Sequence, residues 1–163
     1  MCYSPYGFQW QLARKLLGDG LITEKQFGWV CQRAKKEDDT HANVLLKWRI
    51  ATVETLANAC ERHFKIPLVD LAQAQTDLKK TAQLFGILGS ILLFKRFCAD
   101  FGVIPLALRD DVSLQVAMEE PSFQITNQMH TISGRKIQTC LSVGNMGEMI
   151  EHAFAPLVEE EVR

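Results

Sequence analysis

Cys60 and His63 are separated by two residues, a spacing that is found in metal sites. His41 could add a third ligand to such a site. Structural zinc sites use four protein ligands, however, and no second cysteine pair lies near these residues in the sequence. A thiol packed in the core and a histidine at the surface explain the pair more simply, so we expect no metal and no cofactor.

Two pairs of adjacent carboxylates, Asp110-Asp111 and Glu119-Glu120, could bind a cation or take part in acid–base chemistry. The first pair falls in a predicted hairpin turn, and the second precedes a predicted helix. Aspartate favours turns, and a negative charge complements the positive end of a helix dipole. We therefore interpret both pairs as structural. The run Glu159-Glu160-Glu161 is interpreted as a solvated tail, with binding to a basic partner as the alternative.

Nucleotide hydrolysis is not indicated by the sequence. No Gly-x-x-x-x-Gly-Lys-Ser/Thr loop occurs, and this is the loop that holds the phosphates of ATP in many hydrolases. Ser133-Gly134-Arg135-Lys136 has some of these residue types, but it fits the end of a helix before a strand. Because no polar residues are spaced as in a catalytic site, we expect no catalytic residues and a protein that is not an enzyme.

The composition is that of a globular protein. Of the 163 residues, 47% are apolar and 23% are charged, which suits one ordinary domain or two small subdomains and argues against disorder. The net charge is −1, and no stripe of Lys and Arg with interleaved aromatic residues is present. We therefore expect no nucleic-acid partner.

Cysteine usage and the lack of long apolar segments indicate the cellular compartment. Five cysteines are scattered without a Cys-x-x-Cys pair, a pattern typical of reduced thiols in the cytoplasm. The N-terminus lacks a basic segment followed by an apolar one, and the longest apolar run, Ile87 to Phe94, is too short to span a bilayer. We expect a cytoplasmic protein that does not insert directly into a membrane.

The elements that would position a site begin with a repeat of two helical hairpins. A helix is predicted over 8–17, and a Thr-x-x-Gln capping box begins a second helix at Thr23. Two further helices follow the same pattern, the last beginning at Thr52. Aligning Leu16-Leu17 with Leu45-Leu46 gives a repeat period of 29 residues, and two such hairpins can bury each other's apolar faces.

The C-terminal half has the pattern of a small β-β-α-β-α unit. The predicted elements are an extended segment at 66–71, a helix within 84–101, a strand at 103–108, a turn at 109–111, a strand at 112–118, a helix from Pro121 closed by Gly134, a strand at 136–143 and a helix from Asn145 that stops at Pro156. The predicted fold class is α/β (α+β). Its parts are a four-helix subdomain at 8–64, a connecting segment and helix at 65–101, and the small α/β subdomain at 102–157.

These features together resemble the N-terminal domain of type II secretion and type IV pilus assembly ATPases, also called the MshEN or GspE N-terminal domain. That family carries two 24-residue hairpin motifs separated by five residues, which equals the 29-residue period of this chain. It continues with segments similar to Ile66–Leu71, Ile104-Pro105-Leu106, Val116-Ala117-Met118 and Glu120-Pro121, in this order. The resemblance covers about residues 10 to 155. We interpret the chain as a degenerate, free-standing copy without the ATPase, with the excised head of a longer protein as the alternative.

The resemblance implies two bacterial functions. In many members the paired motifs bind cyclic di-GMP, and in secretion ATPases the domain docks on the cytoplasmic part of an inner-membrane assembly protein. It therefore implies a protein partner in a secretion or pilus apparatus, through which the chain would be peripheral to the inner membrane. If cyclic di-GMP binds, the resemblance places its contacts at Gln11, Leu12, Arg14, Leu16, Leu17, Gly20, Leu21, Leu45, Leu46, Lys47, Arg49 and Ile50.

The packing positions of the two motifs are mostly kept, whereas their polar and glycine positions are changed. Gln11 and Thr40 replace the two motif arginines, and neither can reproduce the bidentate hydrogen bonds of a guanidinium. Arg49 replaces a glycine, and its side chain can close the approach that glycine leaves. Arg49, Arg14 or Lys47 could instead supply a phosphate contact from a new position. The other changes are Ala13 and Ala42 for glycine, Ala34 and His63 for glutamine, and Cys31, His41 and Cys60 for leucine.

We therefore predict a non-catalytic interaction or regulatory module that docks on a component of a type II secretion or type IV pilus-type apparatus. The alternative is a cyclic di-GMP sensor with altered ligand contacts. Trp10 and Trp48 lie on predicted helices and belong either to the core or to a partner-binding surface; the sequence does not separate these two interpretations.

Overall fold

The computed structural model describes residues 7–110 and 112–163. Its contacts divide the chain into two compact units, of which the first ends at Leu68 and the second begins at Val69. Among the described residues, no helix combines the length and the apolar character that crossing a membrane would require. The chain has an α/β fold with helices in both units and one mixed sheet, as the sequence predicts.

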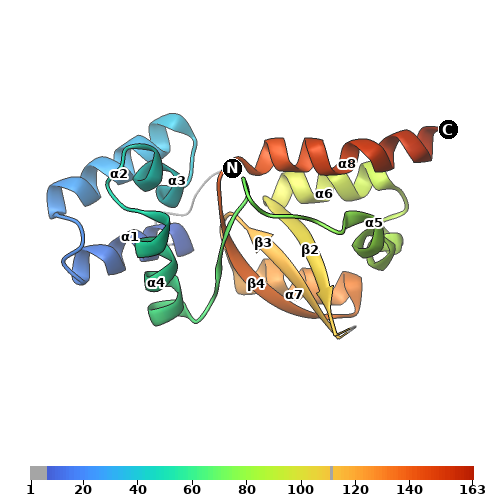
Figure 1. Cartoon of the computed structure of the whole chain (residues 1–163), viewed down its shortest axis with the longest axis horizontal. Helices are drawn as coiled ribbons and strands as arrows, with labels where there is room; N and C mark the ends of the chain where they lie inside the picture. Colours follow the sequence, from blue (N-terminus) through green and yellow to red (C-terminus); the bar gives the residue numbers. More distant parts are fainter. Residues whose placement is uncertain (1–6, 111) are drawn as a thin grey trace. The chain divides into compact units, whose positions relative to one another are not determined.

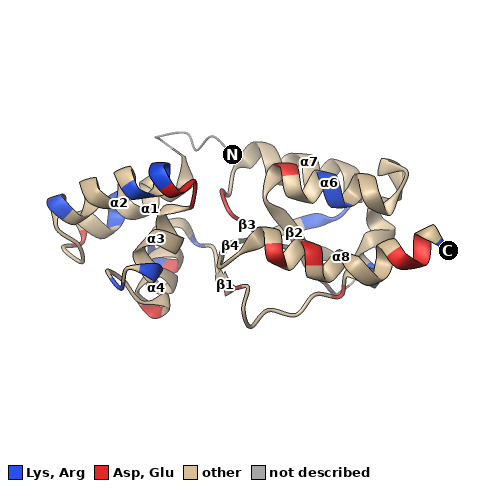
Figure 2. Cartoon of the chain, turned by 90° about the horizontal axis from the view of Figure 1, so that it is seen from above, with Lys and Arg blue, Asp and Glu red and all other residues tan. Residues whose placement is uncertain are grey.

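The described residues of the first unit form four helices (Figure 1): α1 (Phe8–Gly18), α2 (Glu24–Glu37), α3 (His41–Lys47) and α4 (Val53–Phe64). The predicted capping box is present, since Thr23 accepts a hydrogen bond from the Gln26 backbone and the Gln26 side chain accepts one from Thr23. Thr52 caps α4 in the equivalent place. The predicted pair of helical hairpins is therefore confirmed. Lys and Arg lie near both ends of α2 (Figure 2).

The two hairpins bury a shared apolar core. Helix α1 contacts each of the other three helices, and α2 contacts α3. The buried side chains recur at helical spacing on every helix, which is the pattern expected of amphipathic helices that pack on one another. The fully buried ones include Leu12, Leu16, Val30, Val44, Leu45, Leu56 and Cys60.

The second unit is built on a four-stranded sheet in the order β1-β4-β3-β2. Its strands are β1 (Leu68–Asp70), β2 (Val103–Arg109), β3 (Ser113–Met118) and β4 (Lys136–Val143). β2 and β3 form an antiparallel hairpin, and β3 and β4 are parallel. Pro105 is tolerated in β2 because this strand lies at the edge of the sheet, where a missing N–H costs little.

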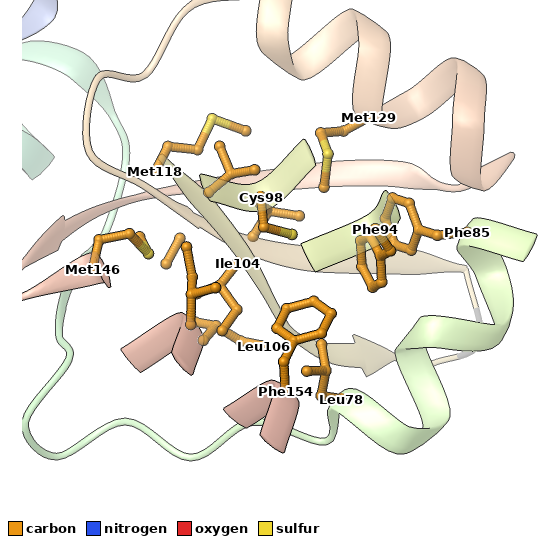
Figure 3. Packing of buried hydrophobic residues seen from close by; sticks show 14 of the residues in the cluster. Leu78, Phe85, Phe94, Cys98, Ile104, Leu106, Met118, Met129, Met146 and Phe154 are labelled. Carbon is orange, nitrogen blue, oxygen red and sulfur yellow. The ribbon is translucent and has the colours of Figure 1, made fainter. Parts of the chain in front are cut away.

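Helices cover the sheet and complete the core of the second unit. They are α5 (Leu78–Thr81), the 3-10 helix η1 (Ala82–Leu88), α6 (Ile91–Phe101), α7 (Phe123–Ser133) and α8 (Met146–Val162). Figure 3 shows Phe85, Phe94 and Phe154 close together in this core. Phe85 and Phe94 stack at 4.4 Å between ring centroids, and Phe94 meets Phe154 edge-on at 5.2 Å.

Several boundaries in the second unit differ from the prediction; β1 is shorter than the predicted segment at 66–71, and β2 continues to Arg109 instead of ending at residue 108. The apolar stretch within 84–101 is split at Gly89, where φ is +97°, and only α6 is a regular helix. Strand β3 begins at Ser113, one residue late, and α7 begins at Phe123 after the N-cap Ser122, whereas the prediction has the helix begin at Pro121. Helix α8 continues through Pro156 to Val162, because Leu157 and Val158 pack against the core beyond the proline.

Candidate functional site

The turns of the two hairpins have the same backbone conformation. Gly20 has a φ of +76°, and Arg49, 29 residues later, has a φ of +56°. Their amides donate to equivalent carbonyls, that of Leu17 at 3.0 Å and that of Leu46 at 3.1 Å. The repeat therefore extends to the backbone, and Arg49 adopts a left-handed conformation that favours glycine.

The contact between α1 and α4 contains an ion pair. The Asp19 carboxylate accepts a hydrogen bond from Arg62 and lies 2.7 Å from Nε2 of His63. The hydrogen bond with His63 is the main cause that lowers the pKa of Asp19, and the Arg62 charge adds to it. A pocket of about 340 Å³ opens beside this pair, and it is lined by Asp19, Leu21, Thr55, Asn58 and Arg62.

The repeat makes α3 the equivalent of α1 and α2 the equivalent of α4. The contact between α2 and α3 is therefore equivalent to the contact between α4 and α1, and it contains two tryptophans. Trp48 stands at the position of Asp19, and Trp29 at the position of Asn58. The two rings meet edge-on at 5.4 Å between centroids, and they are 38% (Trp29) and 43% (Trp48) exposed. The Arg33 guanidinium lies 4.8 Å from the Trp48 centroid and 5.9 Å from that of Trp29. An exposed aromatic–cation cluster thus replaces the polar pocket of the other hairpin contact.

Glu37 holds the cations of this cluster in place. Its Oε1 accepts a hydrogen bond from Nε of Arg33 at 2.9 Å and lies 3.6 Å from Nζ of Lys47. Burial raises the pKa of Glu37, but the hydrogen bond from Arg33 and the Lys47 charge bring it below its ordinary value. The carboxylate therefore stays ionised at neutral pH and orients Arg33 across the Trp48 ring.

The residues at which the resemblance places cyclic di-GMP contacts are dispersed over different environments. Leu21 lines the pocket, and Lys47 joins the aromatic cluster with Nζ 6.0 Å from the Trp48 centroid. The core contains Leu12, Leu16 and Leu45; Leu17, Leu46 and Ile50 are half-buried; and Gln11, Arg14, Gly20, Leu21, Lys47 and Arg49 are exposed.

Several changed motif positions have structural roles. Thr40, at a motif arginine position, is fully buried and accepts a hydrogen bond from the Asn43 backbone as the N-cap of α3. Ala13 and Ala42, at glycine positions, are fully buried. At the glutamine positions, Ala34 is buried, whereas His63 contacts Asp19.

Gln9 is a site residue that the sequence analysis missed. It is fully buried, and its Oε1 accepts a hydrogen bond from the Ala42 backbone at 2.9 Å. This bond links α1 to the first turn of α3 and satisfies a donor that would otherwise lack a partner within the helix. A signal was present in the sequence, because helical spacing puts position 9 on the same face as Leu12 and Leu16.

The cysteines of the described part are poor candidates for nucleophiles. Burial raises the pKa of the Cys60 thiol to about 12, and it also raises the pKa values of Cys31, Cys98 and Cys140. A thiol must lose its proton to react or to bind a metal. Residues 7–110 and 112–163 contain no group of three or more His, Cys, Asp or Glu that could hold a metal ion.

The acidic segments serve local structure. Asp110 has a φ of +53° in the β2–β3 turn, whereas Asp111 lies outside the described residues. The prediction that 159–161 form a solvated tail is wrong in part, because these residues belong to α8. The Glu161 carboxylate accepts a hydrogen bond from the Ile91 backbone, with its two oxygens at 3.1 and 3.0 Å, and so caps α6.

Comparisons place this geometry among known proteins. Protein-family models and curated proteins give no match to the chain. Among solved structures, one titled "Structure of MshE with cdg" aligns with a TM-score of 0.57 and 14% identity, over 89% of this chain and 96% of that one. The N-terminal domain of XpsE aligns with a TM-score of 0.43 and 15% identity, over 91% and 98%.

This chain shares the fold of MshE. The predicted resemblance to the N-terminal domain of secretion and pilus ATPases is therefore confirmed at the level of the fold. The identity of 14% means that the likeness concerns the arrangement of the helices and strands, and residue roles must be argued from this chain itself.

Proposed function

We propose that this chain is a non-catalytic docking module for a protein component of a type II secretion or type IV pilus-type apparatus. The observation that carries the proposal is the contrast within the hairpins. The scaffold of the MshE fold is kept, while changed motif positions such as Thr40, which replaces a motif arginine, have structural roles.

The two positions of the motif arginines illustrate this contrast. A guanidinium binds a guanine edge or a phosphate through a rigid fork of N–H donors. Thr40 is buried, and its oxygen is engaged as an N-cap, an interaction that typically contributes about 1 kcal/mol to helix stability. Gln11 is exposed but has no fork of charged donors. A dinucleotide would therefore lack two charged contacts that the resemblance implies.

The first turn of α3 is also poorly suited to an anion, because most of its backbone donors are engaged within the protein. Helix N-termini bind phosphates through backbone N–H groups that lack partners within the helix. Here the amide of Ala42 donates to Gln9, that of Asn43 donates to Thr40, and that of Thr40 donates to Asp39. These donors are satisfied within the protein, which favours a structural role for this end of α3.

Exposed large apolar side chains support a role in protein binding. They include Trp29 and Trp48 in the first unit and Ile87, Leu92 and Phe123 in the second. Exposed apolar groups of this size frequently mark interaction surfaces. The raised thiol pKa values and the missing ATP-binding loop support a non-catalytic role. We propose that the module acts in the cytoplasm, beside the inner membrane, through its partner.

The proposal is tested by direct binding to apparatus proteins from the same genome. The purified chain is immobilised, and the cytoplasmic domains of the inner-membrane assembly proteins are titrated over it by biolayer interferometry. We expect one of these domains to bind with a Kd in the micromolar range or below, a range typical of specific protein complexes. Lack of binding to every domain of every such apparatus in the genome would contradict the proposal.

Cyclic di-GMP binding with altered contacts is the second candidate. It is favoured by the fold shared with a structure of MshE with cdg. The exposed cations Arg14, Lys47 and Arg49 could replace the lost arginines as phosphate contacts. Calorimetric titration of the chain with cyclic di-GMP separates this candidate from the docking proposal, because the titration measures ligand binding without a protein partner.

A further inference from the structure

We propose that the partner binds through the face formed by Trp29, Arg33, Lys36, Lys47 and Trp48, here named the tryptophan–arginine face, and that this face takes an acidic peptide segment. The segment carries a carboxylate beside a large apolar side chain. The inference rests on the proposed function in one respect, namely that the chain docks a protein. It adds the location of the contact and the chemistry of the partner.

The repeat supplies an internal comparison for this face. At the equivalent contact between α1 and α4, Asp19 and Asn58 stand where the tryptophans stand, and Arg62 stands where Arg33 stands. The hairpin fold is thus compatible with small polar residues at both positions. The tryptophans are not required by the scaffold, and their partial exposure means that much of their apolar area remains available to a partner.

The two tryptophan rings already pack against each other. The rings of Trp29 and Trp48 meet at an interplanar angle of 86°, in the edge-to-face geometry that aromatic pairs prefer. A side chain that already packs against a neighbour has less conformational entropy to lose when a partner binds. Tryptophan and arginine are also the residue types most enriched among those that dominate the energy of protein interfaces.

The Arg33 guanidinium adds a directed charge to this pair. In the described part of the chain, its hydrogen bond to Glu37 uses Nε, so both terminal nitrogens retain N–H donors for a ligand. Two such donors match the two oxygens of a carboxylate. A carboxylate bound there would lie beside the tryptophan rings, which places an apolar neighbour of the acidic residue on them.

The charge of the face also favours an acidic segment. Residues 29, 33 and 36 share one side of α2, since they are spaced by four and three residues. Lys36 and Lys47 are exposed and join Arg33 there, whereas Glu37 is the one acidic group that pairs with these cations among the described residues. Figure 2 shows the basic residues of α2 on this helix. Opposite charge on a partner would speed association and fix its orientation.

A nucleotide fits this face less well than a peptide. Stacking of a base requires an open ring face, and Arg33 already lies over one face of Trp48. Glu37 also places a carboxylate within the cluster, which would repel phosphates. The face therefore suits a segment whose negative charge is localised on single carboxylates.

Selection from a random peptide library tests the inference without a known partner. Phage-displayed short peptides are selected on the immobilised full chain, and the selected sequences are synthesised and titrated by fluorescence polarisation. We expect enrichment of Asp or Glu next to Leu, Ile, Phe or Trp. The double variant Trp29→Asn/Trp48→Asp installs the residues of the other hairpin contact and should weaken binding at least about tenfold. Asn58→Ala, on the opposite contact, should leave binding unchanged.

Folding of each variant is checked by circular dichroism and thermal melting, and Arg33→Gln serves as a milder second variant. Selected peptides without acidic residues, or peptides that bind all variants equally, would overturn the inference. The inference would also be overturned if the selection yielded no binding peptide, or if single-stranded RNA competed with the selected peptides for the chain. Acidic peptides that depend on this face, together with no binding to any apparatus protein, would leave the inference standing and overturn the proposed function. If an apparatus protein bound the double variant as tightly as the wild type, the proposed function would stand and the inference would be overturned.

Discussion

The guanidinium of Arg33 lies 4.8 Å from the ring centroid of Trp48 in the contact between α2 and α3. In the equivalent contact between α4 and α1, Arg62 stands at the position of Arg33 and pairs with Asp19, which stands at the position of Trp48. One arginine position therefore has two kinds of partner within a single chain. With the ion pair, a polar pocket is open beside the helices; with the tryptophan, an exposed aromatic cluster occupies the equivalent surface. The two halves of the repeat have diverged at the surface while keeping a common core.

The ion pair of Asp19 predicts a pH dependence of stability. The pKa of Asp19 is lowered in the folded chain, chiefly by the hydrogen bond with His63. The ionised carboxylate therefore stabilises the fold at pH values above the pKa that Asp19 has in the unfolded chain. This contribution is lost as the pH falls through the lowered pKa. Asp19→Asn should therefore reduce Tm at neutral pH, and its difference from wild type should narrow below about pH 4. Thermal melts across this range measure the effect.

Asp38→Asn is the matched control for that experiment, because Asp38 also follows the C-terminus of a helix and asparagine tolerates its φ of +51°. Its Tm difference from wild type should not show the same narrowing. A difference for Asp19→Asn that is constant between neutral and acidic pH would contradict the role assigned to the carboxylate.

The left-handed turn of the first hairpin predicts opposite effects for two neighbouring glycines. Gly20→Ala places a Cβ at a φ of +76°, and it should destabilise the chain by about 1 kcal/mol although no atom lies within 4 Å of the new carbon. Gly18 lies in α1 without a positive φ, and Gly18→Ala should be neutral or stabilise by up to about 1 kcal/mol. Urea unfolding measures both values, and equal effects would contradict the assignment of the turn.

The buried Gln9 predicts a large cost for a small change. Gln9→Ala removes the acceptor of the Ala42 amide and leaves a buried donor unsatisfied, which should cost about 1–3 kcal/mol of unfolding free energy. Gln32→Ala changes an exposed glutamine on α2 and should have an effect within about 0.5 kcal/mol. If the two variants were equally stable in urea, the bond between Gln9 and α3 would be without consequence.

The proline inside α8 predicts a stabilising substitution. Pro156 lacks the N–H that would bond within the helix, and it is exposed at the surface. Pro156→Ala should raise the unfolding free energy by on the order of 1–3 kcal/mol, the larger value being the full cost of proline in a helix interior. Pro121→Ala serves as the control. No stabilisation would indicate that the helix ends at residue 155, as the sequence predicts.

The local elements of this chain could largely be predicted from sequence because their signals are local. Thr23 and Thr52 mark the starts of α2 and α4, and Gly102 and Gly134 end α6 and α7 in left-handed conformations. The end of α8 could not be predicted in this way. Burial of Leu157 beyond the proline depends on residues distant in sequence, and this tertiary packing outweighs the local preference of proline.

The surface features depended on packing that the sequence does not reveal. The repeat period relates Arg33 to Arg62, but their different partners follow from how α2 meets α3 and how α4 meets α1. The sequence left Trp48 open between core and surface. The structure places it at the surface with 43% exposure, beside Trp29, which the sequence analysis did not single out.

The central claim is that the hairpins keep their scaffold for docking while the dinucleotide contacts have been replaced. Calorimetric titration of the purified chain with cyclic di-GMP, with GTP and ATP as controls, tests this most directly. We predict no heat of binding up to high micromolar ligand, because both motif arginines are absent and each lost contact of this kind costs about 1–3 kcal/mol. Selective binding of cyclic di-GMP with a micromolar or lower Kd would contradict it and direct attention to Arg14, Lys47 and Arg49.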